Sequence, residues 1–111
     1  MKIAIVIGSY KMPEFVWLNA IQCLTIFEDD VPLLVSDDRS DKTEEIETVI
    51  QGAFAAFTTS NNRRGHCGGV IQAFVNGLAW AEQEKCDILL KLNQRFIPVL
   101  PEFRELIEKP E

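Results

Sequence analysis

The sequence predicts an α/β fold in which an open, mostly parallel sheet is flanked by helices. Short apolar runs rich in β-branched residues alternate with longer segments whose apolar residues recur at helical spacing. This strand–helix pattern occurs three times and is followed by a fourth strand and a short final helix. Repeated units of this kind form parallel sheets with right-handed crossovers. No internal repeat, low-complexity tract or linker divides residues 1–111, so we expect a single domain.

The first unit begins with residues 2–7, an apolar run that predicts a central parallel strand. The run stops at Gly8, and Ser9 and Tyr10 follow it. A helix is expected from Pro13, because proline suits the first turn of a helix. Its predicted apolar face consists of Val16, Trp17, Ala20, Ile21, Leu24 and Phe27. The spacing alone favours a simple connecting loop at Ser9 and Tyr10 over a loop that binds a base or a phosphate.

The second unit contains the most informative stretch, an apolar strand over residues 32–36 that leads directly into Asp37 and Asp38. Burying two carboxylates within a strand is costly, so we expect both just past its carboxyl end. Open parallel sheets bind ligands at that edge, where two acids could bond to a ribose or a base, or hold a metal. The plainer alternative is that the pair only forms a turn. The spacing Asp41-x-x-Glu44 predicts a capping box at the start of the following helix.

The third unit has a strand over residues 53–59 and a polar, glycine-rich loop over residues 60–69. Arg63 and Arg64 supply positive charge in this loop, and a helix is expected to begin near Gly69. The free N–H groups of that helix could receive a phosphate together with the two arginines. The loop matches neither the Walker phosphate loop nor the dinucleotide fingerprint, so the glycines alone are weak evidence.

The third helix is predicted to bury a face made of Val70, Phe74, Gly77, Leu78 and Ala81. A fourth strand over residues 87–92 ends at residues 93–95, and a short helix is expected over residues 101–107. A polar cluster therefore follows each of the four predicted strands. Because the carboxyl ends of parallel strands meet at one edge of a sheet, these clusters should gather there. Their convergence is stronger evidence for a site than any one cluster.

The acidic composition limits the kinds of partner. The chain has 17 Asp and Glu against 11 Lys and Arg, a net charge of −6, so we expect no nucleic-acid partner. Three widely spaced cysteines make neither a disulfide framework nor a zinc motif, which favours a reducing, cytoplasmic setting. The first apolar run is too short for a signal peptide, and no segment approaches the length of a transmembrane helix.

The order of these motifs resembles the nucleotide-sugar-binding half of glycosyltransferase family 2. The resemblance covers almost the whole chain and rests on four stretches: residues 3–10, residues 35–41, residues 62–77 and residues 90–98. Members of that family have a Rossmann-like GT-A fold and use nucleotide-activated sugars. The resemblance therefore implies a nucleotide-sugar donor, with a UDP-sugar expected, and an acceptor that these residues do not indicate.

The resemblance also assigns nucleotide contacts to residues at the strand ends. These residues are Ser9, Tyr10, Asp37, Asp38, Arg64 and Gly65. Within this set, Ser9 and Tyr10 belong to the base-binding loop, and Asp37 is the acid that contacts the base. Asp38 lies beside it, and Arg64 and Gly65 lie in the loop that approaches the nucleotide. The helix that follows, which carries Asn76, is expected to back this loop.

Two departures from the family pattern change what the resemblance implies. The fourth strand of the family usually ends in Asp-x-Asp, whose carboxylates hold Mg²⁺ or Mn²⁺, and the matching residues here are Asn93, Gln94 and Arg95. A hard divalent cation prefers carboxylate oxygen, so we expect no metal. Two alternatives stay open for Arg95: it pairs with the diphosphate directly, or it points to solvent and the site is inactive. The chain also ends where the acceptor-binding half would begin, and no catalytic base can be identified.

Three functions stay open at this point. The first is a glycosyltransferase of which this chain is the donor-binding half, either as a fragment or as a short natural protein. The second is a non-catalytic nucleotide-sugar-binding or regulatory module with the same fold. The third is another nucleotide-binding α/β enzyme, such as a nucleotidyltransferase, whereas the missing dinucleotide fingerprint counts against an oxidoreductase. The resemblance indicates a family and leaves open the activity of this chain alone and its oligomeric state.

Overall fold

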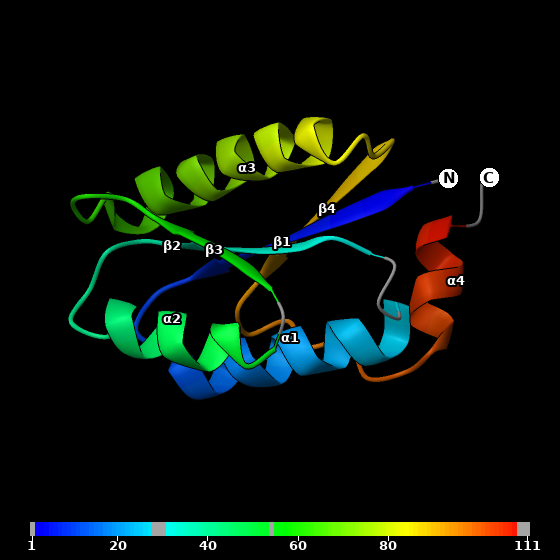
Figure 1. Ribbon diagram of the computed structural model, residues 1–111, viewed down its shortest axis with the longest axis horizontal. Helices are drawn as coiled ribbons and strands as arrows, with labels where there is room; N and C mark the ends of the chain where they lie inside the picture. Colours follow the sequence, from blue (N-terminus) through cyan, green and yellow to red (C-terminus); the bar gives the residue numbers. More distant parts are fainter. Residues whose placement is uncertain (1, 28–30, 54, 109–111) are drawn as a thin grey trace.

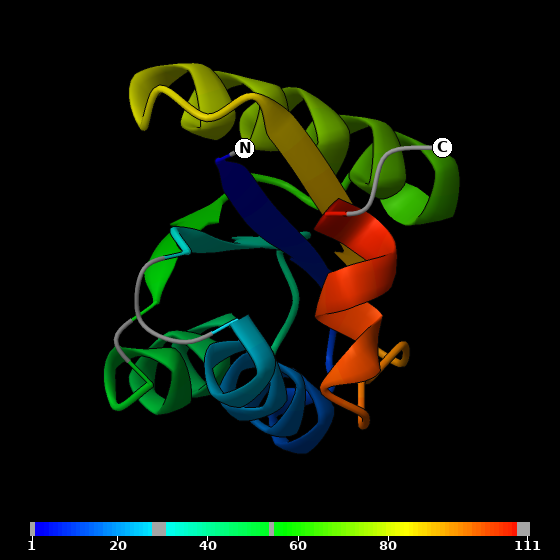
Figure 2. The same cartoon turned by 90° about the vertical axis from the view of Figure 1, so that its right-hand side faces the viewer.

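The computed structural model describes residues 2–27, 31–53 and 55–108, and it confirms an α/β fold with an open parallel sheet (Figure 1). In chain order the elements are β1 (Ile3–Ser9), α1 (Pro13–Phe27), β2 (Leu33–Asp37), α2 (Thr43–Gln51), β3 (Ala56–Thr59), α3 (Gly65–Gln83), β4 (Ile88–Asn93) and α4 (Glu102–Glu108). Helices α1 and α2 cover one face of the sheet, and α3 covers the other (Figures 1 and 2). The third strand is shorter than predicted, and residue 54 of its predicted range lies outside the described residues.

The strand order β3-β2-β1-β4 places β1 between β2 and β4, and all the pairings are parallel. The register sets Ser9 opposite Asp37, and Asp37 opposite Thr59 on the other side. Gly8 of β1 pairs with Asn93 of β4. The carboxyl ends of the strands therefore meet at one edge of the sheet, which is the left side of Figure 1.

The main hydrophobic core fills the space between the sheet and helices α1 and α2. Its fully or almost fully buried members include Ile3, Ile5, Ile7, Val16, Ala20, Cys23, Phe27, Val35, Ile46 and Ile50. Burying a side chain of this size stabilises the fold by about 1.5–3 kcal/mol. Helix α1 begins at Pro13 as predicted, but Trp17 of its predicted apolar face is 45% exposed, whereas Asn19 is completely buried.

Helix α3 packs on the opposite face of the sheet through a narrow stripe of small residues. Ala73, Gly77 and Ala81 are its buried residues, and they recur every four positions. At Gly77 an added Cβ would lie 2.5 Å from Cγ1 of Val6, so the helix backbone rests directly on β1. The prediction that the large apolar residues of α3 are buried is therefore wrong. Their exposed fractions are 42% for Val70, 48% for Phe74 and 49% for Leu78.

The start of α2 also differs from the prediction. The helix begins at Thr43, and the preceding residue Lys42 makes no side-chain capping bond, so the predicted capping box is absent. The backbone N–H of Ser40 instead donates to the Thr43 hydroxyl at 2.9 Å, and that hydroxyl donates to Asp37 at 2.6 Å. This start of α2 is therefore held by the carboxyl end of β2 rather than by its own first turn.

The final helix α4 packs at the end of the molecule opposite the polar sheet edge (Figures 1 and 2). Its Phe103 ring meets the rings of Phe27 and Phe96 at centroid distances of 6.0 and 5.7 Å. In the part of the chain that the structure describes, no helix combines the length and apolar character needed to cross a membrane.

Candidate functional site

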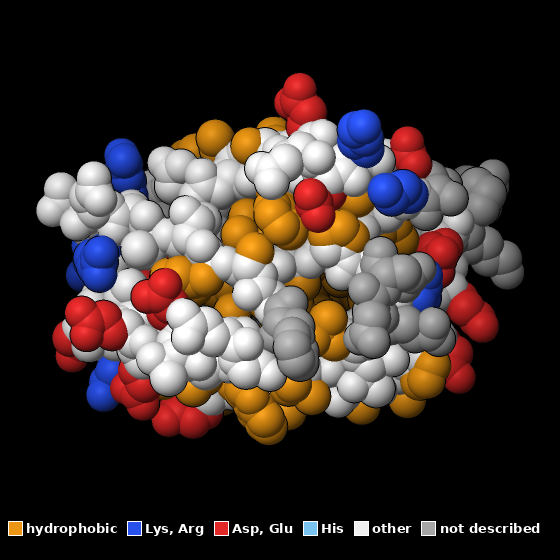
Figure 3. Space-filling model, in the orientation of Figure 1, with side chains coloured by type: hydrophobic (Ala, Val, Ile, Leu, Met, Phe, Trp, Pro, Cys, Tyr) orange, Lys and Arg blue, Asp and Glu red, His pale blue; other side chains and the backbone are white. Residues whose placement is uncertain are grey.

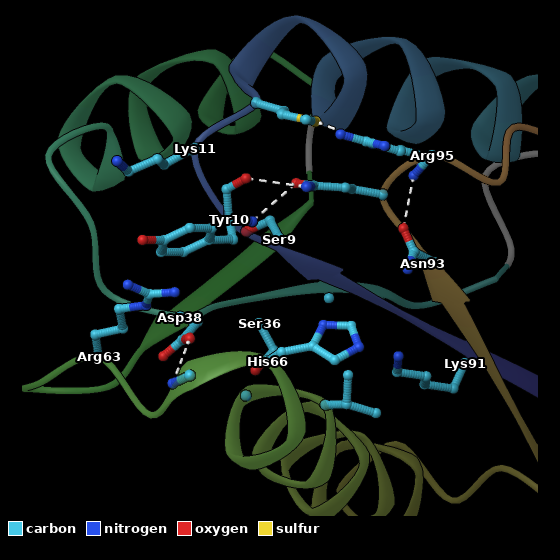
Figure 4. A pocket seen from close by; sticks show the side chains of 16 residues that line it. Ser9, Tyr10, Lys11, Ser36, Asp38, Arg63, His66, Lys91, Asn93 and Arg95 are labelled. Atoms are coloured by element: carbon cyan, nitrogen blue, oxygen red, sulfur yellow. Dashed lines mark hydrogen bonds between the residues drawn. The ribbon is translucent and has the colours of Figure 1, made fainter.

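A cavity of about 540 Å³ opens at the carboxyl edge of the sheet (Figure 4). It is bounded by the end of β1 with the loop after it, the end of β2, the start of α3 and the end of β4. Its polar and charged lining residues are Ser9, Tyr10, Lys11, Ser36, Asp38, Arg63, His66, Lys91, Asn93, Gln94 and Arg95. Of the eight residues predicted for a nucleotide or diphosphate site, six line this cavity, and Asp37 and Arg64 do not.

Asp37 is buried at the end of β2, where its carboxylate joins several elements. It is the last residue of the strand and is 3% exposed. Its oxygens accept hydrogen bonds from the hydroxyls of Ser9 at 2.8 Å, Thr43 at 2.6 Å and Thr59 at 3.3 Å. Burial raises the pKa of this carboxyl above its usual 3.8, and the three hydroxyls oppose that rise. The expectation that Asp37 lies past the strand is wrong, because hydroxyl donors replace the water that burial removes.

Asp38 links the loop after β2 to the first turn of α3. Its own N–H donates to the carbonyl of Ser9 at 2.9 Å. Its carboxylate oxygens accept hydrogen bonds from the backbone N–H groups of Arg64 at 2.6 Å and Gly65 at 3.2 Å. A carboxylate at this place satisfies donors that a helix start leaves unpaired and offsets the positive end of the helix dipole. Asp38 therefore caps α3 from another part of the chain, while it also lines the cavity.

The start of α3 lies closer to the sheet edge than the sequence predicted. The helix begins at Gly65 rather than near Gly69, and Gly65 has a φ of +83°, a conformation that glycine adopts readily. This early start places His66 in the first turn of α3, where it lines the cavity. Asn76 further along α3 donates to the Ser36 hydroxyl at 3.0 Å, so the helix is also tied to β2.

The loop after β1 is held against the loop after β4 by a pair of side-chain bonds. The Gln94 amide accepts from the N–H of Tyr10 at 2.8 Å and donates to the carbonyl of Tyr10 at 2.9 Å. The guanidinium of Arg63 lies over the Tyr10 ring, 4.7 Å from its centre. One face of this ring is therefore covered by a cation, and the ring is fixed at the mouth of the cavity (Figure 4).

The end of β4 is supported by Asn19, a residue that the sequence analysis missed. The completely buried Asn19 amide lies within 3.3 Å of the carbonyls of Asn93, Gln94 and Phe96, to which it donates. A polar residue between the buried Val16, Ala20 and Cys23 of α1 was the signal that could have identified it. The Asn93 side-chain oxygen accepts from the N–H of Arg95 at 3.0 Å, so the turn after β4 has a defined shape.

The charges of the cavity contrast with those of the whole chain. Lys11, Arg63, Lys91 and Arg95 line it, and Asp38 is the one carboxylate among the described lining residues. The chain carries a net charge of −6, and acidic side chains gather elsewhere, including the region around the start of α2 (Figure 3). A cavity with this excess of cations favours an anionic ligand. Within the described residues, no group of three or more His, Cys, Asp or Glu is arranged to hold a metal ion.

One of three comparisons with known proteins found a match, and that match agrees with this fold. The chain matches no family model and no curated protein. It is similar to the crystal structure of S. aureus TarS, a glycosyltransferase, with a TM-score of 0.63 at 12% identity. The match covers 96% of this chain but only 19% of that chain. At this identity the likeness shows the fold alone, a glycosyltransferase-like α/β arrangement.

Proposed function

We propose that the cavity binds a nucleotide-activated sugar, with a UDP-sugar as the expected donor, and that the chain is the donor-binding part of a glycosyltransferase. The observation that carries this proposal is a cation-lined cavity at the carboxyl edge of a parallel sheet, in a chain that is acidic overall. Sheets of this kind bind ligands at that edge, and a diphosphate supplies the concentrated negative charge that such a cavity favours. The likeness in fold to TarS supports the same class of ligand.

The base is assigned to the end of the cavity that contains Tyr10 and Asp38. The Tyr10 ring offers a surface for stacking, on which a base would replace one of the two cations that lie over the ring, Arg63 at 4.7 Å and Lys11 at 5.7 Å from its centre. Asp37 was expected to accept from a base N–H, but it is 3% exposed, does not line the cavity and already accepts hydrogen bonds from three hydroxyls. We therefore assign the polar contact with the base or ribose to Asp38, and to Asp37 the task of positioning the Ser9 hydroxyl.

The diphosphate is assigned to the end of β4, where Asn93 and Arg95 replace the two acids of a metal-binding motif. Among the described residues, the one contact of the exposed Arg95 guanidinium is a weak one with the Met12 sulfur, 3.5 Å from its Nε. It can exchange this contact for a phosphate, which it can bind with two parallel hydrogen bonds. In this proposal the diphosphate is neutralised by side chains, so its binding does not depend on Mg²⁺ or Mn²⁺.

Calorimetric titration with UDP, with and without a chelator, tests the proposal. We expect chelator-resistant binding in the native chain and affinity reduced roughly tenfold or more in Arg95→Ala, because a charge-assisted bond is lost. Lys42→Ala, at the residue before α2 and outside the cavity lining, is the matched control for loss of a surface cation. Binding abolished by the chelator would contradict the metal-free site, and absence of binding by the native chain would contradict the donor site itself.

A second candidate, a binding module without transfer activity, is favoured by the same cavity. Asp38 is its one described carboxylate, and both of its oxygens accept backbone hydrogen bonds. A carboxylate that accepts these bonds is poorly suited to remove a proton from an acceptor hydroxyl. Incubation of the chain with UDP-sugars distinguishes the two: transfer of the sugar to water or to a simple sugar acceptor, with release of UDP, indicates transfer chemistry, whereas bound but intact donor supports the binding module.

A further inference from the structure

The first turn of α3 is not the free phosphate receptor that the sequence suggested. The N–H groups of Arg64 and Gly65 already donate to the Asp38 carboxylate. That carboxylate is packed closely against the helix, since a Cβ added at Gly69 would lie 2.9 Å from Oδ2 of Asp38. A phosphate at the helix start would compete with Asp38 for the same donors and would meet its negative charge. Side chains elsewhere in the cavity are therefore the better candidates for binding a phosphate.

Lys91 is a cation of this cavity that the sequence analysis did not single out. It lies in β4 between Leu90 and Leu92, which pack in the core beneath the sheet, so its side chain projects from the opposite face. There it extends into the cavity (Figure 4). The ammonium lies over the backbone of β1 at Gly8, where an added Cβ would be 3.7 Å from Nζ and 3.4 Å from Cβ of Ala73. A glycine at this position leaves the ammonium open to the cavity.

The ammonium of Lys91 is half-buried without an anionic partner among the described residues. No carboxylate in that part of the chain forms an ion pair with it, and no group accepts a hydrogen bond from it. Burial lowers its pKa, which is the effect of removing a charge from water without compensation. The other charged or titratable groups that share the cavity are Tyr10, Lys11, Asp38, Arg63, His66 and Arg95. Asp38 is occupied at α3, so an anionic ligand is the group that can supply the missing negative charge.

We propose that Lys91, together with His66 from the first turn of α3, forms a phosphate-binding subsite. That the phosphate belongs to a nucleotide-sugar diphosphate rests on the proposed function, whereas the affinity of the subsite for an anion does not. Lys91 provides a compact point charge with three donors, and the His66 ring provides one further N–H. Because Lys91 and Arg95 lie at the same end of β4, the two phosphates of a diphosphate can be shared between them. Lys91 thereby replaces part of the charge that a divalent cation would supply.

Titration of the full chain with UDP, inorganic pyrophosphate and uridine tests this subsite. Lys91→Met removes the charge but keeps a flexible apolar stem of similar length, and Lys91→Arg restores a cation. Lys42→Met is the matched control, since Lys42 forms an exposed ion pair with Glu45 on α2. We expect Lys91→Met to weaken UDP and pyrophosphate binding roughly 10- to 100-fold, the effect of one charge-assisted hydrogen bond, and to leave uridine binding unchanged. Lys91→Arg should recover most of the loss, and Lys42→Met should change nothing.

The possible results separate the subsite from the proposed function. Equal affinity of the native chain and Lys91→Met for UDP and pyrophosphate would overturn the subsite, even if UDP binds well. Pyrophosphate binding that depends on Lys91, with no preference for UDP over pyrophosphate, would support the subsite and count against the nucleotide donor. If the native chain binds neither anion, both fail. Circular dichroism and the urea midpoint of each variant establish that a loss of binding is not a loss of folding.

Discussion

Replacing Asp38 by alanine should destabilise the chain through the start of α3. The carboxylate accepts two backbone hydrogen bonds, at 2.6 Å from Arg64 and 3.2 Å from Gly65. Loss of a helix N-cap side chain costs typically about 1 kcal/mol, and loss of a negative charge at the positive helix end costs about 0.3–1 kcal/mol. The additional link between β2 and α3 brings the expected loss in Asp38→Ala to about 2 kcal/mol. For a domain of this size, a loss of that size lowers Tm by roughly 10 °C.

Thermal and urea unfolding of Asp38→Ala can be compared directly with Asp41→Ala. Asp41 is 72% exposed and forms a single ion pair with Lys11 at 3.9 Å, so its removal should cost less than about 1 kcal/mol. Asp38→Asn keeps one acceptor oxygen and should fall between the two. If Asp38→Ala and Asp41→Ala lose the same stability, the capping role of Asp38 is wrong. Hydrogen exchange should also show that the Arg64 and Gly65 amides, protected in the native chain, lose this protection in Asp38→Ala.

Three further predictions concern the elements that support the cavity. Gly77→Ala should lower the free energy of unfolding, measured in urea, by about 1–2 kcal/mol, because the new Cβ would lie 2.5 Å from Cγ1 of Val6. Alanine is the better helix former, so a variant of equal or greater stability would refute the close contact. Asn19→Ala should cost about 2 kcal/mol and weaken UDP binding, because three carbonyls after β4 lose their donor; unchanged values of both would refute this support. Burial raises the pKa of Asp37 in the folded chain above its unfolded value of 3.8, so the folded chain holds the proton of this carboxyl more tightly. The stability that the protonated carboxyl contributes is fully present below pH 3.8 and is lost as pH rises through the native pKa. Asp37→Asn should therefore gain stability relative to the native chain between pH 4 and pH 7, and a constant difference would contradict this.

The sequence predicted the fold because its strongest signals are local and periodic. The four apolar runs became the four parallel strands, and their polar ends meet at one edge. The buried face of α3 was wrong because the pattern was read by hydrophobicity, whereas the close approach of this helix to β1 selects for size. Ala73, Gly77 and Ala81 are the residues small enough for that contact, and the larger Phe74 is left facing outward.

Six of the eight residues predicted for the site line one cavity, but the hydrogen bonds that these residues make were not predicted. Asp37 and Asp38 are adjacent in sequence, yet one is buried under three hydroxyls and the other caps a distant helix. Neither role follows from the spacing, because their partners lie up to 28 residues away in the chain. Lys91 was overlooked for a related reason. One lysine within an apolar strand carries no motif, and its meaning depends on the missing side chain at Gly8 of the neighbouring strand.

The bonding of the two acids bears on whether a divalent cation could occupy this cavity. Mg²⁺ or Mn²⁺ requires several oxygen ligands, and carboxylates are its preferred protein donors. Asp37 could coordinate such an ion only by releasing hydroxyls that join β1, β3 and α2 to it. Asp38 could do so only by weakening its bonds to the first turn of α3. Each acid would then exchange a structural bond for a metal bond within a cavity lined by four cationic side chains. An anion meets none of these costs, and this is why we propose an anionic ligand bound without a metal.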